Sequence, residues 1–374
     1  MSSQTPRRAA ASQRGMTLVE TLIVSVLASI IVAAAAALLL AGGRVVHNTE
    51  HASDSHDAAR LAGEAIMSKV REAGAGAPGG LWVLRGGVPV RTNPIFGRDG
   101  TTGAGTVGNV RTPDGSDDLW LVLPDPNYMG EPCTTTPDGQ PTGAAVPVVQ
   151  AGTGALRVNC TASLRLGSLH VASNMTTGAL LTVNGLVPES PGTPGQVTYA
   201  EQGVAGFSNA PEKGGFQRGD WVYPVRLVHF FLATNPETGR SALYRAEGRL
   251  ASDALGRPYS HVPTSAPELV QNFVEDFQVV FGFDTTGLEN ADTYSWQHGL
   301  ESEFKPGLRT VRVSVVATGR NPRKDSQSAV VLSDDKPIHA ENNVRPANTV
   351  VADGFYRSLF TRRLELPNLA AASL

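Results

Sequence analysis

A long uncharged run near the N-terminus constrains this chain more than any other feature. Residues 22–41 carry no charge, and Ser25 and Ser29 are their only polar side chains. At 1.5 Å per residue, a helix of about 20 residues spans about 30 Å, which is the thickness of the hydrocarbon core of a bilayer. The sequence therefore predicts a membrane-spanning helix rather than a core helix of a globular protein.

Charges on either side of the run predict its orientation. Arg7, Arg8 and Arg14 precede it, and residues 1–15 contain no acid. Because segments rich in Lys and Arg stay in the cytoplasm, residues 1–15 are predicted to be cytoplasmic. Everything after Arg44 is then predicted to lie across the membrane.

The residues in front of the run carry a resemblance to a known family. A secretory signal places its small residue after the apolar stretch, whereas Gly15 lies before it. The order Gly15-Met16-Thr17-Leu18-Val19-Glu20 resembles the class III signal of type IV prepilins. The resemblance implies that prepilin peptidase cuts between Gly15 and Met16 and that Met16 is then N-methylated. Met16 departs from the usual phenylalanine, and the long leader points towards a minor pilin or a pseudopilin.

The resemblance also assigns a role to Glu20, the fifth residue of the processed chain. A carboxylate in the first turn of a membrane helix is costly unless it is paired. The α-ammonium of Met16 in a neighbouring subunit is the partner that filament assembly would provide, and this pairing would set the stagger of the helices. The alternative is an ordinary signal anchor with Glu20 near the headgroups.

The rest of the chain predicts an α+β, type IV pilin-like fold. Residues 1–15 are the leader, residues 16–43 the membrane and filament-core helix, and residues 44–76 the outer half of the same helix. The glycines of residues 74–80 are predicted to end this helix. Their spacing also fits the G-x-G-x-x-G motif of dinucleotide-binding sites, but that motif requires a preceding strand, and here a helix precedes it. Residues 77–374 are predicted to form an antiparallel β-rich head with a loop-rich insertion at about 125–215, since 40 glycines and 25 prolines imply many turns.

Strands are predicted from short apolar or alternating runs. They cover residues 119–123, 146–150, 155–159, 180–183, 221–233 with a break at Pro224, and 241–247 after a hairpin turn at 235–239. Alternation over residues 277–283 and 310–315 predicts half-buried strands of an antiparallel sheet.

The two cysteines, Cys133 and Cys160, both follow the predicted membrane span. In an oxidising compartment they are predicted to form a disulfide. The bond would close a loop of about 28 residues and contribute on the order of 3 kcal/mol. The alternative is a pair of buried free thiols.

Three C-terminal segments resemble the PilW family of type IV minor pilins, with J-type pseudopilins of type II secretion as relatives. They are residues 242–245; residues 269–279, which in the family form a short helical turn leading into a strand; and residues 308–315 together with 355–368. In the last segment Leu366-Pro367-Asn368 departs from the family's Arg-Asn ending. The resemblance implies a tip or priming complex with the major pilin and other minor pilins, in which the chain presents a PilY-type adhesin.

No sequence feature predicts an enzyme or a cofactor. The short signatures of serine hydrolases, zinc proteases and P-loop proteins are missing, and a net charge of −3 gives no argument for nucleic acid. His47 and His51 are four residues apart in an acidic, histidine-rich stretch that we interpret as a solvated polar face rather than a metal site. Asp114, Asp117 and Asp118 are interpreted as turn-capping residues rather than calcium ligands.

The sequence leaves three functions open. The favoured one is a minor pilin held in the inner membrane before it enters the pilus at the cell surface. The second is a J-type pseudopilin of a type II secretion system, which shares the signal and the fold. The third is a membrane-tethered sugar- or DNA-binding module, which would need a ligand cleft.

Overall fold

The structure is a computed structural model that describes most of the chain after residue 16. The described residues are 17–74, 80–85, 88–98, 106–107, 110–111, 116–125, 146–152, 155–162, 164–174, 177–200, 216–251, 260–263, 266–287, 291–295, 306–320 and 355–366. The chain divides into two compact units, Met1–His51 and Ala52–Leu374.

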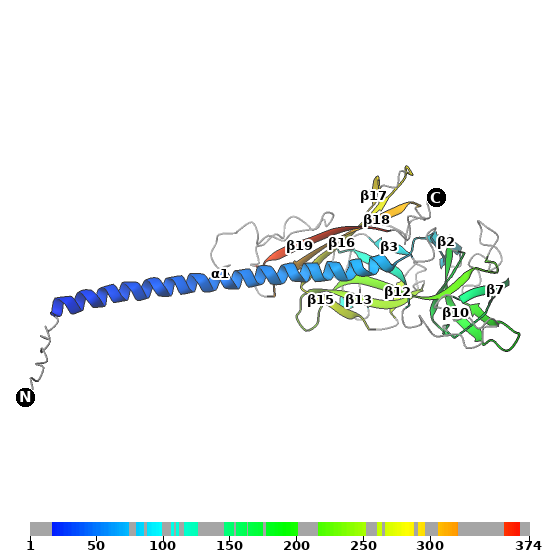
Figure 1. Ribbon diagram of the computed structural model, residues 1–374, viewed down its shortest axis with the longest axis horizontal. Coiled ribbons are helices and arrows are strands. Elements are labelled where there is room, and N and C mark those ends of the chain that lie inside the picture. The colour runs from blue at the N-terminus through cyan, green and yellow to red at the C-terminus, as the bar shows by residue number, and fades with distance from the viewer. Residues whose placement is uncertain are drawn as a thin grey trace, which may run out of the picture. The chain divides into compact units, whose positions relative to one another are not determined.

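One helix, α1, runs from Leu18 to Glu72 (Figure 1). It is rich in Ala and Leu, which are strong helix formers. The helix ends where the sequence predicts, because Gly74 has a φ of 80°, a left-handed conformation that glycine adopts without steric cost. The Ala73 N–H donates to the Val70 carbonyl at 3.3 Å and closes the last turn.

The head is β-rich, and its described strands form two main sheets. The larger one contains thirteen described strands, of which nine follow the order β14-β13-β12-β7-β8-β11-β10-β1-β2. Its strands are β1 (Leu81–Arg85), β2 (Val88–Thr92), β3 (Ile95–Arg98), β6 (Asp118–Pro124), β7 (Val146–Gly152), β8 (Ala155–Val158), β9 (Leu169–Ser173), β10 (Gly178–Val187), β11 (Gly195–Tyr199), β12 (Trp221–Thr234), β13 (Ser241–Ala251), β14 (Ser260–Pro263) and β15 (Glu268–Asn272).

The smaller sheet has the order β17-β16-β18-β19 and contains the last of the described strands. Its strands are β16 (Val274–Phe283), β17 (Thr293–Ser295), β18 (Leu308–Thr318) and β19 (Arg357–Glu365), while β4 (Thr106–Val107) and β5 (Val110–Arg111) form a separate ribbon. Among the described strand pairs, all are antiparallel except β1 with β10, so the antiparallel prediction is confirmed.

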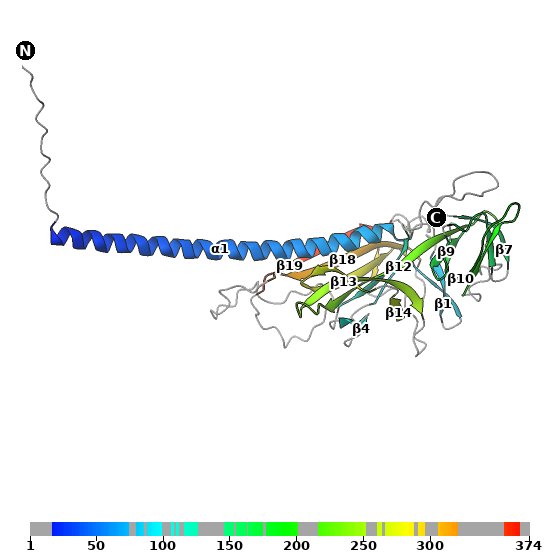
Figure 2. The same ribbon diagram turned by 90° about the horizontal axis from the view of Figure 1, so that it is seen from below.

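Both sheets pack against the part of α1 that follows His51, as Figures 1 and 2 show. The helix contributes Ala59, Ala62, Ile66 and Val70 to this core, at 1% exposure or less. The same core contains apolar side chains of β3, β6, β12, β13, β16 and β18. The outer half of α1 therefore obtains its packing partners from within the chain.

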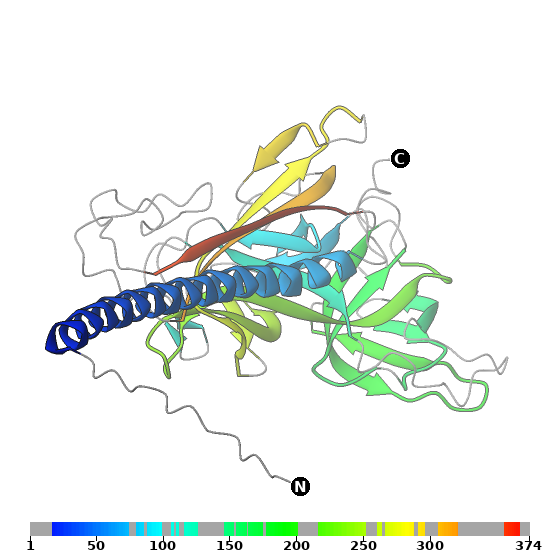
Figure 3. The ribbon, with the colours of Figure 1, turned by 60° about the vertical axis from the view of Figure 1, so that its left-hand side comes forward.

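The last strand lies beside this part of the helix (Figure 3). A Cβ atom at Gly63 would overlap the Phe360 ring of β19, so glycine is what allows the close approach. The Ser55 Oγ lies 2.9 Å from the Ser358 Oγ, which joins the same two elements by a hydrogen bond.

Strands β7 to β11 form a lobe with a hydrophobic core of its own, which includes Leu156, Leu181, Val197 and Tyr199. Figure 1 shows β7 and β10 apart from β16, β18 and β19. The lobe occupies most of the region predicted to be a loop-rich insertion. The sequence predicts β7, β8 and part of β10 there, whereas β9 and β11 are not predicted.

The predicted break at Pro224 is wrong, because β12 continues through it opposite His170 of β9. The Pro224 carbonyl accepts the Asp125 N–H at 3.1 Å. In a strand, the N and O atoms of one residue point to the same edge, so the missing N–H of Pro224 faces the side where β6 has ended at Pro124. The proline therefore costs the ladder with β9 no hydrogen bond.

The prediction that residues 277–283 and 310–315 form half-buried strands is also wrong, since β16 and β18 are buried along almost their whole length. In the smaller sheet, two pairs of polar residues are hydrogen-bonded to each other. The Gln278 Nε2 donates to the Asp276 carboxylate at 2.9 Å, and the Ser314 and Thr361 hydroxyls lie 3.0 Å apart. Alternation of polar and apolar residues does not show whether the polar face is exposed to solvent or is buried with its hydrogen bonds made inside the protein.

The expected helical turn before β16 is replaced by a single residue. Phe273, between β15 and β16, has a φ of 63°, which is rare for a bulky side chain. The Arg240 guanidinium lies over the Phe273 ring at 4.7 Å and over the Phe355 ring at 4.2 Å. The Thr318 N–H donates to the Phe273 carbonyl at 2.8 Å. These contacts hold the backbone of Phe273 in place.

Candidate assembly site

The N-terminal part of α1 is apolar and exposed. Leu22, Ile31 and Leu39 are 60%, 67% and 77% exposed. By length and composition, α1 is the helix within the described residues that can cross a membrane. An apolar core helix would be buried, so this surface requires lipid or other helices as partners outside the chain.

The hydroxyl groups in this part of the helix are satisfied within it. Thr21 donates to the Thr17 carbonyl at 3.1 Å, Ser25 to the Leu22 carbonyl at 2.9 Å, and Ser29 to the Ser25 carbonyl at 2.7 Å. These three hydroxyl groups can therefore lie in hydrocarbon without losing a hydrogen bond.

Glu20 is the one acidic residue of residues 16–43, and it caps its own helix. Its carboxylate accepts the Thr17 N–H at 2.9 Å and the Thr17 hydroxyl at 3.0 Å, while the Glu20 N–H donates to the Thr17 hydroxyl at 3.3 Å. This is a capping box, and its signature Thr-x-x-Glu was present in the sequence, although we did not predict the role of Thr17. Gly15 and Met16 lie outside the described residues, so cleavage and methylation there stay predictions.

The polar face predicted beyond the apolar run is confirmed for Glu50, Asp54, His56 and Asp57, which are exposed, but not for His51. His51 is 4% exposed, and its Nε2 lies 2.9 Å from the His47 Nε2. The two rings meet edge to face, with centroids 4.2 Å apart and an interplanar angle of 81°. Helical spacing brings the two histidines together, since residues four apart lie on one face.

Asp117 and Asp118 make contacts beyond the turn in which they were predicted to act as caps. Both are buried, and the Asp117 carboxylate accepts the Val279 N–H at 2.7 Å, which links the start of β6 to β16. The Asp118 Oδ1 lies 3.3 Å from the Nε2 of His229, whose ring stacks on Trp120 at 4.3 Å. Asp114 lies outside the described residues.

Cys160 is buried at 1% exposure in the core of the β7–β11 lobe. Within the described part of the chain there is no free cysteine. Cys133 lies outside that part, so the Cys133–Cys160 disulfide stays a prediction.

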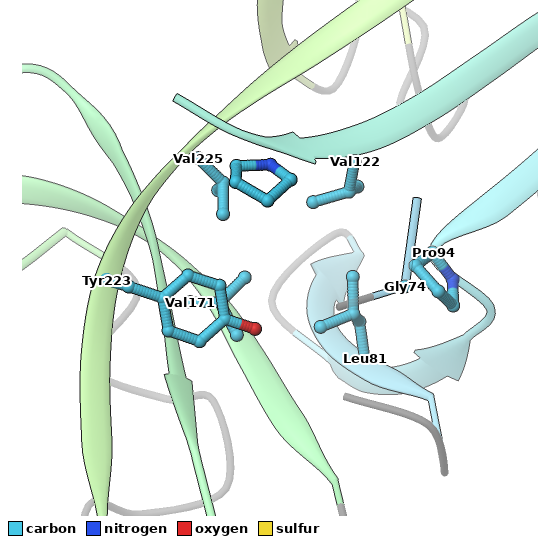
Figure 4. Close-up of a pocket in the computed structure, with 8 residues that line it drawn as sticks. Gly74, Leu81, Pro94, Val122, Val171, Tyr223 and Val225 are labelled. Atoms are coloured by element: carbon cyan, nitrogen blue, oxygen red, sulfur yellow. The ribbon is translucent and has the colours of Figure 1, made fainter. Parts of the chain in front are cut away.

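A small cavity lies among the strands near the end of α1 (Figure 4). Its volume is about 10 Å³, enough for about one water molecule, and burial raises the pKa of the Tyr223 hydroxyl at its wall. It is lined by Gly74, Leu81, Pro94, Val122, Pro124, Val171, Tyr223 and Val225. A cavity of this size and composition cannot hold a sugar or a nucleotide.

Comparison with known families agrees with the N-terminal and C-terminal features. Residues 10–36 match the model of the prokaryotic N-terminal methylation motif, and residues 229–368 match that of the type IV pilus-assembly protein W, PilW. In these two segments the chain is similar to PilW-like type IV minor pilins. A type IV-like pilin from Thermus thermophilus is 17% identical, with a TM-score of 0.23; the alignment covers 41% of this chain and 69% of that protein. No match was found among curated proteins.

The PilW match covers many of the strands that pack on the helix. It begins at His229 within β12 and continues through β13, β15, β16, β18 and β19. The β7–β11 lobe lies outside it. The matched region supplies the described strands of the smaller sheet and part of the larger one, whereas β3 and β6, which also pack on α1, precede it.

Proposed function

We propose that this minor pilin is cut between Gly15 and Met16, methylated at Met16, and built into a type IV pilus within a tip or priming complex. The observation that carries the proposal is the exposed apolar helix of residues 18–41 with Glu20 in its first turn. The helix is held in the inner membrane first, and it then exchanges lipid for the helices of the major pilin and other minor pilins. The head faces outward, where it binds other proteins of the tip complex, among them a PilY-type adhesin.

The capping box sets the state of Glu20 before assembly. While Thr17 donates two hydrogen bonds to the carboxylate, the cost of placing a charge in the first turn of a membrane helix is reduced. In the filament, the α-ammonium of Met16 in a neighbouring subunit replaces or shares these donors. The charge of Glu20 therefore matters for assembly, while its cap matters for the isolated subunit.

Two variants separate charge from capping. Glu20→Gln keeps an acceptor at the third helical position, since glutamine also serves in capping boxes, but removes the charge. We expect Glu20→Gln to abolish incorporation into pili, and Thr17→Ala to retain it with a weakened helix start. Glu50→Gln, an exposed acid on the same helix beyond the apolar run, is the control and should assemble normally.

The measurement is immunoblotting of sheared pili together with N-terminal mass spectrometry of the chain from its host. A methylated Met16 with loss of pili in Glu20→Gln supports the proposal. Methylation with intact pili and lost protein secretion would instead assign the chain to a pseudopilus. An uncut leader in cells with active prepilin peptidase would contradict both.

A further inference from the structure

Two histidines on α1 form a pair that the assembly role does not use. The Nε2 atoms of His47 and His51 are 2.9 Å apart, and both residues belong to one helical turn. Within the described residues, the Nδ1 of His51 is buried without a hydrogen-bond partner. The two Nε2 atoms share a hydrogen bond, with one imidazole as donor and the other as acceptor, so both nitrogens border one small volume beside the helix in which a metal ion could replace the shared proton.

The separation of the two nitrogens matches what a metal ion needs. With a metal–nitrogen bond of about 2.0–2.1 Å, two imidazoles in a right-angled arrangement have nitrogens about 2.9 Å apart, and a tetrahedral arrangement needs about 3.3–3.4 Å. The observed distance is therefore within a few tenths of an ångström of both geometries. A change in side-chain torsion is enough to reach either, because the helix fixes the two Cα atoms.

We propose that His47 and His51 bind one divalent transition-metal ion through their Nε2 atoms. Two neutral imidazoles favour Zn²⁺, Ni²⁺ or Cu²⁺ over Mg²⁺ and Ca²⁺, which prefer oxygen ligands. Water fills the remaining coordination positions, since no third His, Cys, Asp or Glu joins the pair among the residues that the structure describes. The bound ion cross-links one turn of α1 just beyond the apolar segment.

The proposal is tested by isothermal titration of the untagged full-length chain in detergent with ZnCl₂ at pH 7.5. We expect one Zn²⁺ per chain. His47→Ala and His51→Ala should each lower the affinity at least about tenfold, since even the indirect partners of metal ligands are worth about 10–100-fold.

His56→Ala is the matched control, because His56 is an exposed histidine on the same helix. It should leave the affinity unchanged. With Cu²⁺, electron paramagnetic resonance should show coupling to two imidazole nitrogens in the parent chain and to one in each single variant. Unchanged Zn²⁺ binding in the double variant His47→Ala/His51→Ala would overturn the proposal, as would an equal loss of affinity in His56→Ala.

Discussion

The two parts of α1 share one secondary structure but differ in where their partners lie. In residues 18–41 the apolar side chains are exposed, with Ile31 at 67%. In residues 52–72 the apolar side chains form one stripe, and Ile66 is fully buried in the head core. A helix that is apolar all round has to find partners outside its own chain, whereas a one-sided helix is completed by its own sheets. The first part is thus suited to assembly and the second to folding.

The largest expected effect comes from an equal truncation in the two parts. Ile66→Ala removes a fully buried side chain, and we expect it to lower the free energy of unfolding of the head by about 4 kcal/mol through lost burial and a cavity. Ile31→Ala is the matched control and should leave the unfolding of the head unchanged. Urea denaturation in detergent, followed by Trp fluorescence, measures both. Equal destabilisation would show that the two parts do not differ as described.

Acid should affect the head more than the apolar helix. His170 of β9 is fully buried, and burial lowers its pKa from 6.5 to about 3. Its Nε2 lies 3.0 Å from the Ser168 hydroxyl. Since the unfolded chain binds the proton more readily, stability is full above pH 6.5 and falls as the pH drops towards 3. At pH 5 the loss is about 2 kcal/mol.

The control for this prediction is His170→Leu, which cannot bind a proton. Its urea midpoint should vary less between pH 7 and pH 5 than that of the parent chain, by an amount equivalent to about 2 kcal/mol. An identical pH dependence in the two proteins would show that His170 does not titrate on unfolding.

A glycine-to-alanine change should have opposite signs in the two parts of the helix. At Gly63 the new methyl group would overlap the Phe360 ring, so we expect Gly63→Ala to destabilise the head by about 1–3 kcal/mol. Adding Phe360→Leu should restore part of this loss by making room. If Gly63→Ala leaves the free energy of unfolding unchanged, β19 and α1 have room for the extra methyl group, and the prediction is contradicted.

At Gly42 a methyl group would meet nothing within 4 Å. Gly42→Ala should therefore stabilise the helix by about 0.5–1 kcal/mol, because alanine loses less backbone entropy in a helix. Circular dichroism of the full chain during heating would show a helical signal that persists to higher temperature. A lower helical signal would mean that glycine has a packing role there in the isolated subunit.

The sequence predicts the long-range organisation better than the local exceptions. The apolar run, the end of α1 at Gly74 and the β12–β13 hairpin follow from hydrophobic period and turn chemistry, which are local signals. Pro224 within β12 and the left-handed Phe273 depend on Asp125 and Arg240, which are distant in the sequence. The burial of His51 and Gln278 could not be predicted, because polar residues indicate solvent until their partners are known. For Glu20, the sequence indicates the charge, and the structure adds the cap from Thr17.

The contact between Gly63 and Phe360 has a consequence for the order of events during synthesis. Gly63 is translated before Phe360, and about 300 residues lie between them. Until Phe360 and Leu364 have emerged, part of the apolar stripe of the helix lacks its cover. A nascent or prematurely terminated chain would therefore expose this stripe to proteases and chaperones until β19 has been made.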